Sequence, residues 1–514
     1  MGHAYEGISA DIISRYHNMR SEEGCFFVTG SDEHGQKIAG VAQEKGQEPI
    51  DLCDHYVGGF KVLNQRSLVG EDDYVRTTSE RHKMNCQELW RKCAEAGDIY
   101  LGDYEGWYNV REELFVPEAE AAKTNYIDVV SGKELKKVKE TSYFFRMSKY
   151  QERLVSYIQA NPSFIEPEGC RNNLLQRLGE PLRDLSISRT TFSWGIPVPD
   201  GFEKDHVMYV WFDALTNYLT GVDGLAVEGA DPNLTSLWPA DCHIIGKDIM
   251  WFHCVIWPCM LMSAGIPLPV SVFCHGFIND KEGKKMSKTL KNTIDPHEMI
   301  DKYGADAFRW YLSKECPFGS DMSFNEANLE IMYNSDLCDT LGNLMHRATN
   351  LCLKYCAGKV TPVELTEKPP VDIVRLRDEV DEMMKKLQLD AVASAVMAAF
   401  RDINKYLADS APWKLKGDEH QPAREAIIKT VLECVYSCSH FLIPFIPLGA
   451  KAIFEKLSTP PKLLHDLNND MNDLKEGTVI SIGEMLYKRP DLNDAKAREE
   501  VSVLCILCLC RCAR

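Results

Sequence analysis

The sequence predicts an α/β fold, in which the strands of a mostly parallel sheet alternate with helices, followed by a helical bundle. Strand-like and helical segments alternate at the start of the chain and again between about residues 207 and 275. Residues from about 60 to 185 break this alternation with short strands, turns and charged stretches, which indicates an insertion. After about residue 325 the pattern is almost wholly helical until about residue 457.

The first elements follow from the spacing of apolar residues. Residues 7–20 are predicted to form an amphipathic helix, because apolar side chains recur near one face. Those side chains are Ile8, Ile12, Ile13, Tyr16 and Met19. A short buried strand over Cys25–Thr29 follows, and then a second helix over residues 36–45.

The same alternation returns after the insertion. Val207–Phe212, Asp241–Gly246 and Val270–His275 are predicted to be strands, with a helix from about residue 248 between the last two. Strands that alternate with helices in this way are typical of a parallel sheet.

Length and composition set the broad class. A chain of 514 residues predicts two to four domains, and 45% hydrophobic with 26% charged residues is typical of a globular protein. No apolar run reaches the roughly 18 residues that cross a bilayer, and the first residues lack a secretory signal pattern. We expect no membrane association, and a cytoplasmic or organellar location.

The net charge of −18 counts mildly against a nucleic-acid partner, although a local basic groove remains compatible with it. The 19 cysteines form no disulfide framework and are interpreted as reduced thiols. For the cysteines at positions 505, 508, 510 and 512 a poorly packed terminus is favoured over a metal site, because no histidine or acid lies nearby.

Two short motifs suggest phosphate chemistry. Lys285, Ser287 and Lys288 lie in a Lys-Met-Ser-Lys-Thr sequence, where two ammonium groups and a hydroxyl can converge on a triphosphate. Gly2-His3 opens a helix, whose free N–H groups suit a phosphate. Taken alone, the first motif is equally compatible with a solvated basic loop, and the second with a stray histidine.

Together the motifs resemble those of the class I aminoacyl-tRNA synthetases, which pair His-X-Gly-His with Lys-Met-Ser-Lys-Ser. Thr289 keeps the hydroxyl of the second motif, and Gly2-His3 matches the end of the first. Three longer segments resemble the methionyl-tRNA synthetase family, namely Thr29–Gln36, Tyr209–Tyr218 and His243–Asp248. Gly342–Arg347 and Ala411–Trp413 extend the resemblance into the helical half.

The resemblance implies the architecture. It is a Rossmann-type nucleotide-binding fold split by a connective insertion and followed by an all-α anticodon-binding bundle. The expected parts are residues 1–60 and 186–284 for the catalytic domain, 61–185 for the insertion, 285–325 for the lysine loop and stem-contact region, 326–457 for the anticodon domain and 458–514 for a tail.

The resemblance also implies the reaction and its participants. Methionine would be activated by ATP, which enters with Mg²⁺, and transferred to tRNA(Met). ATP would contact Gly2, His3, Gly246, Asp248, His275, Gly276, Lys285, Ser287 and Lys288, with His3, Lys285 and Lys288 acting in catalysis. Methionine would contact Asp32 through its ammonium and Trp211, Ala214, Tyr218, Ile249 and His253 through its thioether. Asn343, Arg347 and Trp413 would read the CAU anticodon.

Structural explanations compete with these roles. Trp211 and Tyr218 are seven residues apart and share a helical face, which also suits core packing, and His253 alone would be an ordinary core histidine. Asn343 and Arg347, four residues apart, also suit an exposed helix face. The family resemblance favours the binding roles.

Two departures from the family pattern stand out. No cysteine or histidine lies between Cys93 and Cys170, so we expect an insertion without the family's zinc knuckle and no structural metal. The family's first strand and first histidine have no counterpart before Gly2, so we expect an opened sheet and doubtful activity of the chain as written.

Other enzymes and a non-enzyme compete with this assignment. The leucyl, isoleucyl and valyl enzymes usually carry larger editing insertions, and the cysteinyl enzyme needs zinc ligands near its amino-acid site. A general nucleotidyltransferase would not explain Asn343, Arg347 or Trp413. The remaining alternative is an inactive or truncated synthetase-like tRNA-binding protein. A monomer is favoured.

Overall fold

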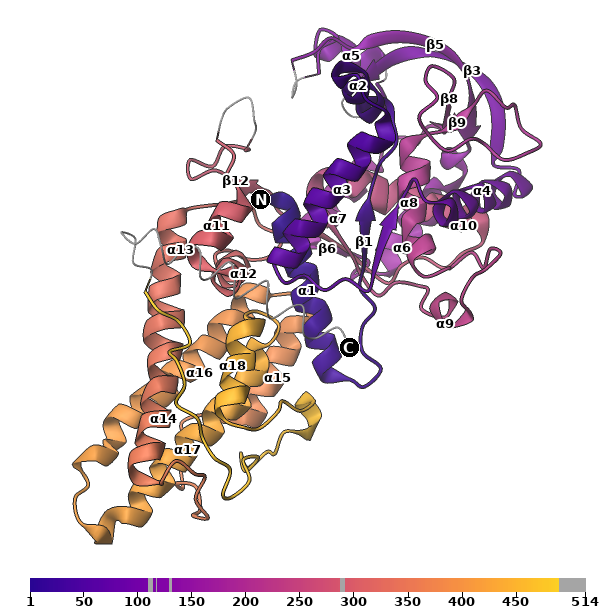
Figure 1. Cartoon of the computed structure of the whole chain (residues 1–514). Helices are drawn as coiled ribbons and strands as arrows, with labels where there is room; N and C mark the ends of the chain where they lie inside the picture. Colours follow the sequence, from indigo (N-terminus) through magenta and orange to yellow (C-terminus); the bar gives the residue numbers. More distant parts are fainter. Residues whose placement is uncertain (110–113, 117, 129–131, 287–291, 490–514) are drawn as a thin grey trace. The chain divides into compact units, whose positions relative to one another are not determined.

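The computed structural model describes residues 1–489, apart from residues 110–113, 117, 129–131 and 287–291 (Figure 1). Ser287, Lys288 and the cysteine-rich tail lie outside the described residues. The chain divides into two compact units. The sheet unit comprises Phe26–Lys61 and Glu71–His275, and the helical unit comprises Met1–Cys25, Val62–Gly70 and the chain from Gly276 onward.

Two parallel ladders form the nucleotide-fold part of the sheet unit. Strand β1 (Val28–Ser31) pairs with β2 (Asp73–Arg76). Strand β11 (Val272–His275) lies between β10 (His243–Gly246) and β6 (Ile165–Glu166). Within the described residues these ladders are separate sheets of two and three strands. The predicted strands over 241–246 and 270–275 are thus confirmed.

Helix α8 (Val210–Gly221) contacts both ladders. It packs against β1 and β2, where a Cβ on Gly221 would lie 2.5 Å from Cγ1 of Val28. One turn earlier, the ring of Tyr218 stacks on His243 of β10, with 4.1 Å between the ring centroids. Gly221 therefore allows α8 to approach β1 closely, and Tyr218 packs the same helix against β10.

The prediction of a strand over Val207–Phe212 is wrong. Only β9 (Val207–Met208) is extended, and it pairs antiparallel with β8 (Ser188–Arg189) before α8 begins at Val210. The helix buries residues on nearly all sides, so its apolar run has no helical periodicity to distinguish it from a buried strand.

The stretch predicted to be an insertion contributes most of an antiparallel sheet in the order β4-β3-β5-β7. Its two long strands are β3 (Ile99–Asn109) and β5 (Lys136–Phe145), with β4 (Leu114–Val116) and β7 (Leu185–Ser186) at the edges. These strands are longer than the sequence predicts, because glycines and charges on their exposed faces interrupt the apolar alternation. The other helices before residue 276 are α2 (Gln36–Lys45), α3 (Pro49–Arg66), α4 (Glu80–Glu95), α5 (Glu118–Lys123), α6 (Gln151–Ala160), α7 (Glu168–Arg177), α9 (Pro232–Thr235) and α10 (Trp257–Ala264).

The helical unit opens with α1 (Gly2–Arg20), which confirms and extends the first predicted helix. Its short strands β12 (Ile278–Asn279) and β13 (Met322–Ser323) pair in parallel. The predicted helical stretch from about residue 325 to 457 is confirmed. The unit's helices are α11 (Pro296–Tyr303), α12 (Ala305–Lys314), α13 (Glu326–Met332), the π-helical turn Tyr333–Gly342, α14 (Asn343–Tyr355), α15 (Ile373–Lys385), α16 (Leu389–Ser410), α17 (Gln421–Ser439) and α18 (Pro447–Lys456).

A fully buried guanidinium joins distant segments of the helical unit. Arg309 of α12 donates through Nη2 to Oδ2 of Asp11 in α1 at 2.5 Å, and to the carbonyl oxygen of Pro444 at 2.6 Å. Its remaining N–H groups donate to the carbonyl oxygens of Ser67 at 3.0 Å and Phe445 at 3.2 Å. The charge is therefore both paired and hydrogen-bonded, as a buried arginine requires.

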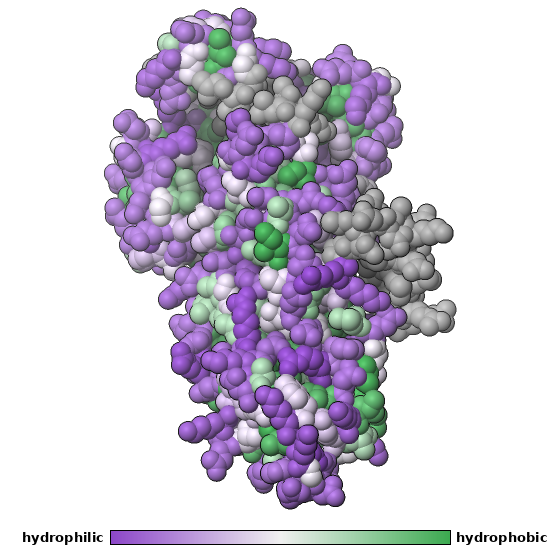
Figure 2. Space-filling view, turned by 90° about the vertical axis from the view of Figure 1, so that its left-hand side faces the viewer, coloured by the Kyte–Doolittle hydropathy of each residue, from purple (hydrophilic) through white to green (hydrophobic). Residues whose placement is uncertain are grey.

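The described surface matches the composition. On the face shown in Figure 2, hydrophilic residues predominate and hydrophobic ones are scattered among them, as is normal for a globular protein. None of the described helices combines the length and the hydropathy that a membrane crossing requires.

Candidate active site

Three residues predicted to contact ATP meet at the carboxyl ends of β10 and β11. Gly246 is the register partner of His275, and Asp248 lies in the short helical turn that follows β10. A Cβ on Gly246 would lie 2.7 Å from Oδ1 of Asp248 and 3.8 Å from Cε1 of His275. A side chain at residue 246 would therefore make the Asp248 carboxylate shift from this position. The carboxyl ends of parallel strands are where ligands bind in α/β folds, so this position suits a nucleotide.

The residues predicted to surround the thioether come together around α8. Trp211, Ala214 and Tyr218 lie on one face of the helix, and His253 approaches from the π-helical segment Phe252–Ile256. Ring centroids are 6.3 Å apart for Trp211 and His253, and 5.6 Å apart for Tyr218 and His253. The backbone carbonyl of Ile249, the fifth predicted residue, contacts His253 as well.

The hydrogen bonds of His253 assign its tautomer. Nδ1 lies 3.0 Å from the carbonyl oxygen of Ile249, which can only accept, so Nδ1 carries the proton. Nε2 then accepts from the hydroxyl of Tyr218 at 2.7 Å. Burial lowers the pKa of His253 to about 4, so the ring is neutral at pH 7. The result is an uncharged, polarisable wall that suits a thioether.

Phe252 lies among the residues predicted to surround the thioether, but sequence reasoning did not include it. Its ring stacks on Trp211 with centroids 3.7 Å apart and an interplanar angle of 10°. Its position next to His253 was the available signal, but phenylalanine beside a buried histidine does not distinguish a pocket wall from core.

Asp32 follows directly after β1 and is exposed. The residue after it is anchored, because the buried Glu33 carboxylate pairs with Arg76 at 2.8 Å and accepts from the hydroxyl of Thr78 at 2.6 Å. His34 continues this anchor with a contact of 2.7 Å between Nδ1 and Oδ2 of Asp213 in α8. The backbone that carries Asp32 is thus held in place by the contacts of the two residues that follow it, Glu33 and His34.

Asp213 centres a buried polar network. Its second oxygen lies 3.1 Å from Nε2 of His82, whose Nδ1 is 2.9 Å from the hydroxyl of Thr220. Burial alone would raise the pKa of Asp213, but the charges and hydrogen bonds of His34 and His82 lower it below its usual value. With Cys86, His82 and Asp213 form the one group of potential metal ligands found among the described residues. Because these groups form hydrogen bonds with one another, we interpret the network as a structural one that fixes the position of α8.

Two further predicted residues lie in the helical unit near β12. Gly276 is approached closely by the backbone, since a Cβ there would lie 2.0 Å from the carbonyl oxygen of Ser320. Lys285 is exposed, and its Nζ lies 4.7 Å from the centroid of the Phe277 ring. Gly2 and His3 are exposed in the first turn of α1.

The three residues predicted to read the anticodon lie on the surface of the helical unit. Asn343 begins α14 and is exposed, and Arg347 follows one turn later. The guanidinium carbon of Arg347 is 5.6 Å from the centroid of the Trp413 ring, which is 39% exposed. An exposed ring beside a guanidinium, with an exposed amide one turn from the arginine on α14, is suited to stacking and edge recognition of unpaired bases.

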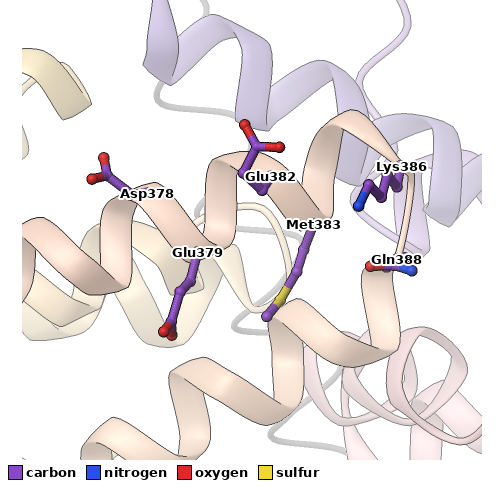
Figure 3. A pocket seen from close by; sticks show the side chains of 6 residues that line it. All are labelled: Asp378, Glu379, Glu382, Met383, Lys386 and Gln388. Atoms are coloured by element: carbon purple, nitrogen blue, oxygen red, sulfur yellow. The ribbon is translucent and has the colours of Figure 1, made fainter.

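A hollow of about 330 Å³ on the helical unit contains none of the predicted site residues. Figure 3 shows the side chains that line it, on α15 and the turn that follows; they are Asp378, Glu379, Glu382, Met383, Lys386 and Gln388. Glu379 pairs with Arg375 and Glu382 with Lys385, so these carboxylates belong to surface ion pairs.

Comparisons with known proteins agree with the predicted family. Residues 1–349 match the family described as tRNA synthetases class I (M), and residues 364–501 match the anticodon binding domain of methionyl tRNA ligase. A methionine–tRNA ligase of Caldanaerobacter subterraneus is 38% identical over 97% of this chain and 78% of its own length. That of Thermotoga maritima is 38% identical over 96% of this chain and 79% of its own length.

Solved structures give the same result. Mycobacterium tuberculosis methionyl-tRNA synthetase bound by methionyl-adenylate is similar with a TM-score of 0.87 and 34% identity, covering 95% of this chain and 96% of that one. Its apo form has a TM-score of 0.82 and 33% identity, covering 95% and 94% of the two chains. The chain therefore belongs to the methionyl-tRNA synthetase family, and it combines the class I α/β fold with a helical anticodon-binding domain.

Proposed function

We propose that this methionine–tRNA ligase performs both half-reactions with the residues assigned below. In the first, the methionine carboxylate attacks the α-phosphorus of ATP, and the bond to the leaving pyrophosphate breaks. In the second, a terminal ribose hydroxyl of tRNA(Met) attacks the carbonyl carbon of the adenylate, and AMP leaves. Neither step needs a protein nucleophile, so catalysis depends on positioning and on charge stabilisation.

The neutral aromatic wall around His253 carries the proposed choice of methionine. Trp211, Ala214, Tyr218, Ile249 and His253 would contact the side chain, and burial keeps His253 uncharged. The hydroxyl of Tyr218 already donates to His253, so discrimination against leucine would rest mainly on shape and polarisability. At the other end of methionine, the carboxylate of Asp32 would pair with the ammonium.

For ATP, the carboxylate of Asp248 would accept a hydrogen bond from a ribose hydroxyl, with Gly246 and His275 beside it. Lys285 would contact the phosphates as charge grows on the leaving pyrophosphate, and ATP would enter with Mg²⁺. Gly2, His3 and Gly276 complete the proposed contacts, together with Ser287 and Lys288, which lie outside the described residues.

We propose that the insertion needs no zinc. Trp107 and Tyr126 pack with ring centroids 4.4 Å apart, and Glu118 accepts from Trp107 Nε1 at 2.6 Å and from the Tyr126 hydroxyl at 2.8 Å. A zinc-selective chelator is expected to leave the melting temperature and the exchange activity unchanged, whereas Trp107→Ala should lower stability by about 1 kcal/mol. Loss of activity with the chelator, restored by zinc, would contradict the proposal.

The anticodon assignment is tested with Trp413. Trp413→Ala is expected to lower kcat/KM for tRNA(Met) by about 10-fold or more, because stacking on an aromatic side chain contributes about 1–3 kcal/mol per base. Methionine-dependent pyrophosphate exchange, which needs no tRNA, should be unchanged. Trp238→Ala is unsuitable as a control, because Nε1 of Trp238 donates to a backbone carbonyl oxygen. The control is Leu448→Ala, because Leu448 is exposed and lies in the helical unit, as Trp413 does. An unchanged kcat/KM for tRNA(Met), or an equal fold-loss with an RNA that lacks the anticodon arm, would contradict the assignment.

A further inference from the structure

One carboxylate connects the two ends of the segment that carries the Lys-Met-Ser-Lys-Thr sequence. Oδ1 of Asp280 accepts from the backbone N–H groups of Glu282 and Lys284, each at 2.9 Å. Its Oδ2 accepts from Nδ2 of Asn292 at 2.7 Å. Residues 282 and 284 precede the lysine sequence and residue 292 follows it, so Asp280 joins both sides.

The same contacts extend to Lys285. Nδ2 of Asn292 also lies 3.3 Å from the carbonyl oxygen of Lys285. The backbone of Lys285 forms an antiparallel bridge with Asn279, and its ammonium lies over the ring of Phe277. The backbone and the side chain of Lys285 are therefore both held by residues that surround Asp280.

Backbone hydrogen bonds hold the segment that carries Asp280. The backbone N–H of Phe324 donates to the carbonyl of Asn279 at 2.9 Å, next to the pairing of β12 with β13. The turn closes with hydrogen bonds from Asp280 N–H to the Lys284 carbonyl at 2.8 Å and from Gly283 N–H to the Asp280 carbonyl at 2.9 Å. Gly283 has a φ of 77°, which a side chain would strain.

An ionised carboxylate is the appropriate group at this centre. It only accepts hydrogen bonds, and here three N–H donors point at its two oxygens. The hydrogen bond from Asn292, followed by that from the backbone of Lys284, lowers the pKa of Asp280 below its usual value. The group is therefore charged at neutral pH, which strengthens each of these bonds.

We propose that Asp280 and Asn292 form a brace that positions Lys285 for the activation step. Asp280 is a positioning residue, since it acts through Lys285 and not on ATP. The proposal rests on the proposed role of Lys285 at the phosphates. Adenylate formation depends on placing charged groups where charge develops, and a displacement of about 1 Å can cost about 100-fold in rate.

The chain offers an exchange of partners as the test. In Asp280→Asn, one amide faces three donors with a single oxygen, so either the backbone N–H groups or Asn292 loses its acceptor. In Asn292→Asp, two carboxylates face each other across the 2.7 Å contact. In the double variant Asp280→Asn/Asn292→Asp, the oxygen of residue 280 accepts from the backbone, and its amide donates to the new carboxylate at 292.

Each single variant is expected to lower kcat for methionine-dependent ATP–pyrophosphate exchange by about 10-fold to 100-fold, with the KM for methionine unchanged. The double variant should recover part of the loss, because the hydrogen bonds of residue 280 return, whereas a carboxylate at 292 no longer donates to the carbonyl oxygen of Lys285. Asp295→Asn is the matched control, because Asp295 caps α11 and asparagine caps equally well. Hydrogen exchange of the backbone N–H groups of residues 282 and 284 shows whether the brace is formed, independently of catalysis. This exchange should be faster in both single variants than in the parent and the double variant.

Single variants with parental kcat, or a double variant whose fold-loss in kcat equals the product of the two single fold-losses, would overturn the proposed role. Equal hydrogen exchange in all four proteins would show that no brace exists. A parent chain without methionine-dependent exchange would contradict the proposed activity instead, and hydrogen exchange would still decide whether the brace is present.

Discussion

Lys285→Gln is expected to lower kcat for methionine-dependent ATP–pyrophosphate exchange by about 100-fold or more. The substitution keeps a polar chain of similar length and removes the charge. Negative charge grows on the leaving pyrophosphate, so the ammonium stabilises the transition state more than bound ATP, and removing one such donor costs about 100-fold to 1,000-fold. Because Lys285 is exposed, its replacement should leave the melting temperature unchanged.

Lys284→Gln provides the control for the charge. Lys284 is adjacent and exposed, and its ammonium pairs with Glu282 at 2.9 Å. Its backbone contribution to the turn is unaffected by a change of side chain. We expect its kcat to stay within about twofold of the parent. A fall of similar size in both variants would mean that general basic charge, and not the position of Lys285, supports the reaction.

Arg309→Ala is expected to lower the free energy of unfolding of the helical unit by about 3–5 kcal/mol. The guanidinium is fully buried, and its loss would leave the Asp11 carboxylate, 2% exposed, without one of its two arginine partners, together with unpaired carbonyl groups at Pro444 and Phe445. Asp11→Asn added to Arg309→Ala should recover part of the loss, because it removes the poorly compensated buried charge.

Urea unfolding followed by circular dichroism measures this change. Arg375→Ala is the matched control, since the side chain of Arg375 is 76% exposed and its pair with Glu379 lies on the surface. Such pairs contribute at most about 1 kcal/mol. If the midpoint for Arg309→Ala shifts no more than that for Arg375→Ala, the buried pair does not stabilise the unit as described.

The fold was predictable where periodicity was strong. The helix over residues 36–45 and the strands that end at Gly246 and His275 appear as expected, because Gly46 stops the helix and the strand runs are short. Val207–Phe212 was mispredicted because α8 is buried on nearly all sides, so its run of apolar residues also fits a strand. Tertiary packing against two ladders, which no local pattern encodes, determines the helix.

The site was predictable only through resemblance to the family. Spacing along the chain placed Trp211 and Tyr218 on one face, but it did not indicate that Phe252 would stack on Trp211. It also gave no signal for Asp280, whose partners are backbone N–H groups and an amide twelve residues away. The turn contacts of Asp280 are typical of an aspartate in a glycine-containing turn, but its contact with Asn292 leaves no local pattern in the sequence.

The chain is expected to activate methionine with ATP. The most direct measurement is ATP–pyrophosphate exchange by the full chain with methionine, leucine, isoleucine, valine, cysteine and norleucine, each supplied alone at the same concentration. We predict that methionine gives the highest kcat/KM whatever the absolute rate, and that Lys285→Gln abolishes most of the exchange. Exchange driven as well by leucine or cysteine, or exchange unaffected by Lys285→Gln, would contradict the account.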